Sequence, residues 1–173
     1  MNYIIVYALT ALASLFEWPV ESGDFRVSAG IIVFMVALHH KRFSRPILMS
    51  LGAGLVVTLF RVGVASLSGG QSRVFSYLLE ISFYVGYGIV YTLISRYHED
   101  QIYPPTLLFT FFLSDFGGNL LEFIIRNLIG DQGYSSVSFL TLFLAALLRS
   151  LLIILFLWIW HKLDQKARPV KGA

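Results

Sequence analysis

The sequence contains no cysteine and few charged residues, and both shortages narrow the class of protein. The absence of cysteine excludes disulfides, thiolate metal sites and thiol nucleophiles. Charged residues make up 13% of the 173 residues, about half the fraction of a typical soluble domain, while 57% are hydrophobic. This composition predicts an integral membrane protein with no separate soluble domain.

Polar segments and segments containing glycine or proline divide the chain into six apolar stretches, each predicted to be a helix. They are Tyr3–Phe16, Arg26–Leu38, Ile47–Leu67, Val74–Ser95, Thr106–Ile129 and Phe139–His161. The last four are long enough to cross a hydrocarbon core, which needs about 20 residues. The first two are short and fit either as tilted helices or with one of them half-inserted and shielded by its neighbours. Glu17–Pro19, between them, is expected to be a loop.

The fold class is therefore all-α, a polytopic bundle of six transmembrane helices. Residues 1–161 form one domain and residues 162–173 a short basic tail. Eight cations flank the helix ends on one side: Lys41, Arg42, Arg45, Arg96, Lys162, Lys166, Arg168 and Lys171. Only three lie on the other side: Arg26, Arg73 and Arg126. Because cytoplasmic loops are enriched in cations, both termini are predicted to be cytoplasmic in a protein of the cell membrane.

Five ionisable side chains lie inside the predicted membrane helices: Arg61, Glu80, Asp115, Glu122 and Arg149. Each costs about 2.5–3.5 kcal/mol at the centre of a membrane helix. Because of this cost, they must face one another, water or a ligand. At a rise of about 1.5 Å per residue, three reach the outer half of the bilayer and two lie nearer its middle. This placement predicts a polar cavity that opens toward the outside.

The fifth predicted helix carries four polar residues at spacings that place them on one face. They are Asp115, Asn119, Glu122 and Arg126. The fourth helix repeats this spacing with a carboxylate followed by three phenols: Glu80, Tyr84, Tyr87 and Tyr91. The predicted ligand-binding cluster is Arg61, Glu80, Tyr84, Tyr87, Asp115, Asn119, Glu122 and Arg149.

Within this cluster we expect one of the two arginines, Arg61 or Arg149, to pair with Asp115 or Glu122. Tyr84 and Tyr87 are expected to form aromatic walls. Arg73 and Arg126 are expected at the outer rim, where headgroup water lowers the cost of their charge.

Two interpretations of the buried charges stay open. Ion pairs can simply lock helices together, and a tyrosine stripe can be ordinary packing. Alternatively, arginines recognise an anion and carboxylates an amine or a proton, which together suits a polar or zwitterionic small molecule. The four histidines fall at helix ends, and no serine has a histidine or lysine partner at membrane depth. The sequence therefore predicts no metal site, no cofactor and no enzyme.

The order of features resembles the membrane-embedded N-terminal sensor region of multi-pass bacterial sensor histidine kinases. The features are two short helices, Phe25-Arg26, Gly52-Ala53-Gly54 with Arg61, Ser114 to Asn119, and Arg149. Such regions are similar in topology to the substrate-binding subunits of energy-coupling-factor transporters and to small cell-shape proteins. A complete sensor kinase would continue into a dimerisation helix and an ATP-binding domain, so the expectation is an isolated or truncated sensor module, or a stand-alone relative. In the transporter subunits, helix one presents alanines four residues apart, whereas Ala8, Ala11 and Ala13 are closer here.

The resemblance and the charges together predict a membrane sensor or receptor module that binds a small polar or zwitterionic ligand from outside. The sixth helix would pass the signal to a cytoplasmic partner or kinase domain. The alternatives are a transporter substrate-binding subunit and a non-catalytic scaffold. The expected partners are the lipid bilayer, the ligand, a cytoplasmic kinase or transporter component, and a second copy in a homodimer. Nucleic acid is not expected, because the net charge of +3 arises from cations at helix ends.

Overall fold

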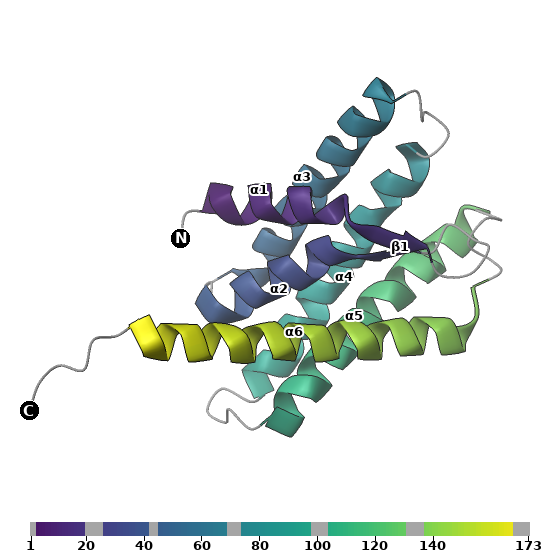
Figure 1. The fold of residues 1–173 in the computed structure, drawn as a ribbon. Coiled ribbons are helices and arrows are strands. Elements are labelled where there is room, and N and C mark those ends of the chain that lie inside the picture. The colour runs from purple at the N-terminus through teal and green to yellow at the C-terminus, as the bar shows by residue number, and fades with distance from the viewer. Residues whose placement is uncertain are drawn as a thin grey trace, which may run out of the picture.

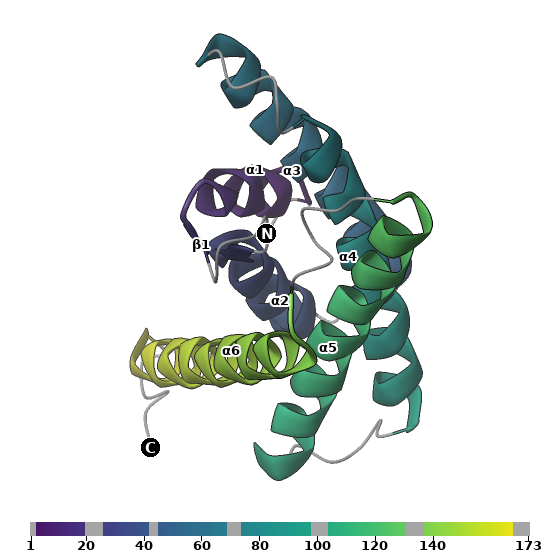
Figure 2. The same ribbon diagram turned by 90° about the vertical axis from the view of Figure 1, so that its right-hand side faces the viewer.

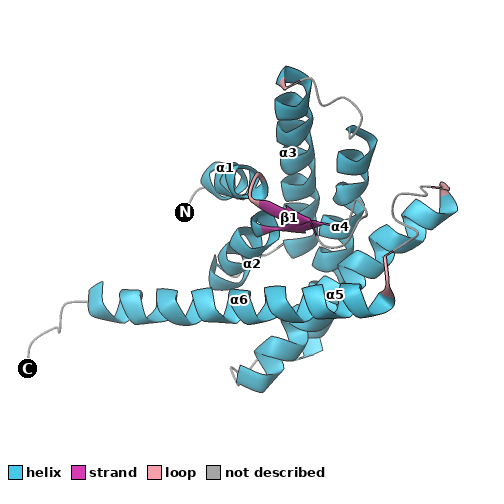
Figure 3. Cartoon of the chain, turned by 45° about the vertical axis from the view of Figure 1, so that its right-hand side comes forward, coloured by secondary structure: helices cyan, strands magenta, loops and turns pink. Residues whose placement is uncertain are grey.

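The computed structural model describes residues 3–19, 26–41, 45–68, 74–97, 104–130 and 137–167. In this part of the chain it contains six helices and one short hairpin (Figures 1 and 3). The helices are α1 Tyr3–Ser14, α2 Ala29–Lys41, α3 Pro46–Leu67, α4 Val74–Tyr97, α5 Pro104–Leu128 and α6 Phe139–Ala167. The predicted number and order of helices are confirmed for these residues.

Helices α3 to α6 are the four that are long and apolar enough to cross a membrane, as their sequences predicted. The two remaining apolar helices, Tyr3–Ser14 and Ala29–His40, are shorter than a bilayer span. Leucines on the outer faces of the long helices stay exposed, among them Leu59, Leu144 and Leu148. An apolar exterior of this kind fits lipid better than water.

The connection between α1 and α2 differs from its prediction, because it forms a two-stranded antiparallel hairpin. Strand β1 spans Glu17–Pro19 and strand β2 spans Arg26–Ser28, with Trp18 opposite Val27. The prediction that Glu17–Pro19 is a loop and that a helix begins at Arg26 was wrong. The branched side chain of Val27 is buried with residues of α6, and the short strands pair with each other. This tertiary contact favours an extended backbone over another helical turn.

Other helix ends differ from the predicted ends by a few residues. Helix α3 begins at Pro46 and α5 at Pro104, where proline fits because the first turn needs no backbone N–H. Helix α6 continues six residues beyond the predicted end at His161, to Ala167. The prediction ended it at the polar boundary of the membrane, but hydrogen bonding along a helix can continue into water.

The helices form a closed ring, in which each packs mainly against two neighbours. The order around the ring is α1, α2, α6, α5, α4, α3 and back to α1 (Figure 2). Helix α4 lies between α3 and α5, and α6 crosses α5 (Figure 1). Side chains that point inward from any helix therefore meet near the centre of the ring.

Small residues let the α3–α4–α5 side of the ring pack closely. A Cβ atom on Gly88 of α4 would lie 2.4 Å from the Oγ of Ser50 on α3. A Cβ atom on Gly118 of α5 would lie 2.8 Å from the backbone oxygen of Phe83 on α4. Such close backbone contact is common between membrane helices, where dispersion and hydrogen bonds replace the hydrophobic effect. It fixes the register in which the charged side chains face one another.

Candidate functional site

The predicted cluster residues come from four elements of the ring and point into its interior. Most of their side chains are buried, although Glu80 keeps 19% of its side-chain surface exposed. The buried ones are Arg61, Tyr84, Tyr87, Asp115, Asn119, Glu122 and Arg149. Together with Arg126, which the predicted cluster did not include, the charges are organised around three arginines, each with a carboxylate partner.

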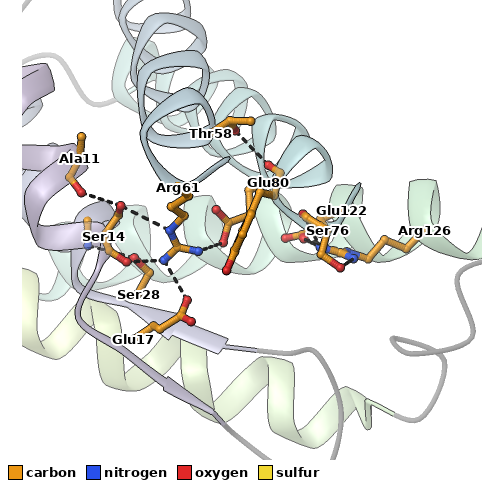
Figure 4. Close-up of polar contacts among 12 residues, drawn as sticks. Ala11, Ser14, Glu17, Ser28, Thr58, Arg61, Ser76, Glu80, Glu122 and Arg126 are labelled. Carbon is orange, nitrogen blue, oxygen red and sulfur yellow. Dashed lines mark hydrogen bonds and ion pairs between the residues drawn. The ribbon is translucent and has the colours of Figure 1, made fainter. Parts of the chain in front are cut away.

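Arg61 of α3 is held on every side of its guanidinium group (Figure 4). Its Nη1 lies 2.6 Å from Glu80 Oε1 of α4, and its Nη2 lies 3.0 Å from Glu17 Oε2 of β1. Its Nε donates to Ser14 Oγ at 3.3 Å, and its Nη2 also donates to the Ser14 backbone oxygen. This one side chain therefore ties together α1, the hairpin, α3 and α4.

Arg126 of α5 is also fully engaged, and its position corrects the prediction. It was expected at a hydrated rim, but it is only 2% exposed. Its Nη2 lies 2.7 Å from Glu122 Oε1 one turn earlier. It also donates to the backbone oxygen and Oγ of Ser76 on α4, at 3.0 and 3.3 Å. The ion pair and these hydrogen bonds replace the water that a rim position would have supplied. Arg73 lies outside the described residues.

Arg149 of α6 pairs with Asp115 of α5, at 2.7 Å between Nη2 and Oδ1. This is one of the pairings that the sequence left open. Asn119 Nδ2 also donates a hydrogen bond to Asp115 Oδ1, at 2.7 Å. The same carboxylate oxygen therefore contacts two nitrogens, one from Arg149 and one from Asn119. The Arg149 guanidinium lies over the ring of Phe83 on α4, 5.1 Å from its centroid.

This pair differs from the other two because its arginine, as well as its carboxylate, has buried atoms without hydrogen-bond partners. Asp115 Oδ2 and Arg149 Nε are both buried, and neither has a partner among the residues that the structure describes. A buried polar atom without a partner is costly, and native proteins leave few of them. Two further such atoms in the described part of the cluster are Glu80 Oε2 and Arg149 Nη2, of which Arg149 Nη2 keeps its ion-pair contact with Asp115 Oδ1.

Two tyrosines of α4 lie between the charge pairs. The rings of Tyr84 and Tyr87 lie edge-on to the ring of Phe83, with centroids 5.7 and 6.0 Å away, and Phe83 is the ring over which the Arg149 guanidinium lies. Tyr87 donates its hydroxyl to the backbone oxygen of Phe111 at 3.2 Å. Charges and phenols therefore form one continuous interior cluster. Its opening toward the outside stays a prediction.

Three residues of the cluster escaped the sequence analysis. Ser14 and Glu17 bind Arg61, and Ser76 binds Arg126. Glu17 had been assigned to a loop outside the membrane, and serines in helices are too common to single out. Only the folding of the hairpin against α3 brings Glu17 to the arginine.

Metal binding finds no support in the described residues, where no three histidine, cysteine or acidic side chains gather as a metal ion would require. Comparisons with protein-family models, with curated proteins and with solved structures find no match to this chain. The resemblance to sensor kinase regions therefore stays a prediction.

Proposed function

We propose that the protein is a receptor module of the cell membrane that binds a small polar ligand between α5 and α6. In this proposal both termini are cytoplasmic, and α6 transmits the signal to a cytoplasmic partner. Four apolar helices of spanning length and an interior lined with charge support the proposal. The resemblance to sensor kinase regions points the same way.

The observation that carries the proposal is the incomplete bonding of Asp115 and Arg149. An arginine that served only to lock helices would gain most stability if all its nitrogens were bonded, as those of Arg61 and Arg126 are. Asp115 Oδ2 and Arg149 Nε instead keep a free acceptor and a free donor in the protein interior. A ligand that supplies the missing partners would gain strong hydrogen bonds in a medium that screens them weakly.

The position of Arg149 would allow ligand binding to affect the cytoplasmic end of α6. Arg149 is near the middle of α6, and α6 packs against α5 and α2. Binding at the pair would change the contacts that hold α6 against α5. A ligand shifts such an equilibrium only if its affinity differs between the two positions of the helix, and a directly contacted ion pair provides that difference. Helix α6 then carries the shift to Ala167.

Spin labels can test this movement, because the chain has no native cysteine. One double variant, Phe109→Cys with Leu163→Cys, places labels on exposed positions of α5 and α6. The matched control, Leu93→Cys with Phe109→Cys, reports on α4 and α5, which form the tightly packed side of the ring. Pulsed electron paramagnetic resonance in nanodiscs would measure both distances with pools of amino acids, polyamines, quaternary amines and short carboxylic acids.

We expect at least one pool to change the α5–α6 distance while the α4–α5 distance stays constant. Equal changes in both pairs would indicate a general loosening of the bundle rather than a signal. If no pool changed either distance or the thermal stability, the scaffold function would be favoured.

A further inference from the structure

The two unpartnered groups at the α5–α6 contact have opposite hydrogen-bonding character. Asp115 Oδ2 is an acceptor on a carboxylate that is fully buried. Arg149 Nε is a donor on a guanidinium that is 2% exposed. A single ligand that satisfied both atoms would need a donor, best cationic, and an acceptor, best anionic, within one small molecule.

The surroundings of the pair limit the ligand further. Arg149 Nε has no hydrogen-bond partner and no ion-pair contact among the described residues. A simple anion bound there would lie beside the negatively charged Asp115 carboxylate, which would repel it. A simple cation would leave Arg149 Nε without a partner. Arg61 and Arg126 cannot serve an anionic group without breaking their own contacts with Glu80 and Glu122. A molecule with both charges avoids these costs, because each end meets the opposite charge.

We propose that the α5–α6 site binds an amino acid zwitterion, with its ammonium on Asp115 Oδ2 and its carboxylate on Arg149 Nε. The inference rests on the receptor function proposed above and specifies its ligand class. Asn119 acts as a positioning residue, because its amide donates to Asp115 Oδ1 and leaves Oδ2 as the oxygen for the ammonium. The ring of Phe83 contacts the Arg149 guanidinium, 5.1 Å from its centroid, and helps to hold it in place.

The test is the melting temperature of the full chain in nanodiscs with probes that separate the two charges. Glycine, L-serine and β-alanine carry both charges, ethylammonium and acetate carry one each, and acetamide carries none. We expect a zwitterion at roughly ten times its Kd to raise the melting temperature by about 3–6 °C. Ethylammonium, acetate and acetamide are expected to cause no saturable shift.

Variants assign the shift to the site. Asp115→Asn should abolish the response to zwitterions, and the matched change Asp164→Asn, near the end of α6, should preserve it. If Asp115→Asn does not fold, the double variant Asp115→Asn/Arg149→Gln removes both charges, is less costly than a lone buried charge, and must also be unresponsive.

Three results would overturn the inference. A response to ethylammonium or acetate equal to that of glycine would show that one charge suffices, and the receptor function would survive with another ligand class. A zwitterion response that persisted in the double variant would place the site elsewhere. No response to any of the three zwitterions would remove the ligand class, while the spin-label distances would still decide the receptor function independently.

Discussion

The arginines of α3 and α6 occupy similar interiors but are bonded very differently. Arg61 contacts two carboxylates, a serine hydroxyl and a backbone oxygen, and it joins four elements. Arg149 contacts one carboxylate across a single helix pair and keeps Nε without a hydrogen-bond partner in the described chain. The first arrangement is suited to holding the bundle together. The second is suited to recognition, because atoms without partners can gain from a ligand.

The largest expected effect follows from removing the saturated arginine. Arg61→Met should lower the free energy of unfolding by about 3–5 kcal/mol, because Glu17 and Glu80, both more than four-fifths shielded from water, would lose their cation. Thermal unfolding in detergent micelles, followed by circular dichroism, would measure it. A loss below about 1 kcal/mol would be typical of an ordinary surface ion pair. It would contradict the assignment of Arg61 as the arginine that holds the bundle together.

A smaller effect is expected at the less bonded pair. Asp115→Asn should cost about 2–3 kcal/mol, because it leaves the Arg149 guanidinium buried beside a neutral amide. The double variant Asp115→Asn/Arg149→Gln should lose at least about 1 kcal/mol less than the sum of the single losses. Strict additivity in this cycle would mean that the two groups do not interact.

Glycine substitutions compare the packed contact between α4 and α5 with an exposed face of α3. Gly118→Ala should destabilise the protein by about 1–3 kcal/mol, because the new Cβ would lie 2.8 Å from the backbone oxygen of Phe83. Gly63→Ala is the control, since a Cβ atom at that position would have no neighbouring atom within 4 Å and alanine favours a helix. We expect Gly63→Ala to be neutral or slightly stabilising. A loss as large as that of Gly118→Ala would indicate an effect of helix geometry rather than of packing.

The smallest perturbation tests the orientation of the chain without disturbing either arginine. Single cysteines at the exposed positions Leu67 and Leu128 should react with a membrane-impermeant maleimide added outside intact cells. Cysteines at Arg45 and Leu163 should react only after permeabilisation, because these ends carry the cations that favour the cytoplasm. The reverse pattern would contradict the predicted orientation.

Periodicity and composition were sufficient for much of the helical framework. The apolar stretches predicted α3 to α6 because each residue in lipid needs its backbone hydrogen bonds satisfied within the helix. The face shared by Asp115, Asn119 and Glu122 also followed from spacing, and all three are buried. These features depend on local geometry, which a sequence contains directly.

The tertiary structure decided which charges meet and which atoms stay unpartnered. Spacing could not show that Arg61 binds Glu17 of the hairpin, because the hairpin itself depends on contacts between distant segments. It also could not show that Arg126 is buried against Ser76, since an arginine near a helix end is compatible with a rim or an interior position. The sequence by itself determined that buried charges needed partners, because an isolated charge in lipid is too costly. The choice of partner required the crossing of α6 over α5 and the docking of α1 on α3, because ion pairs are short-range and directional.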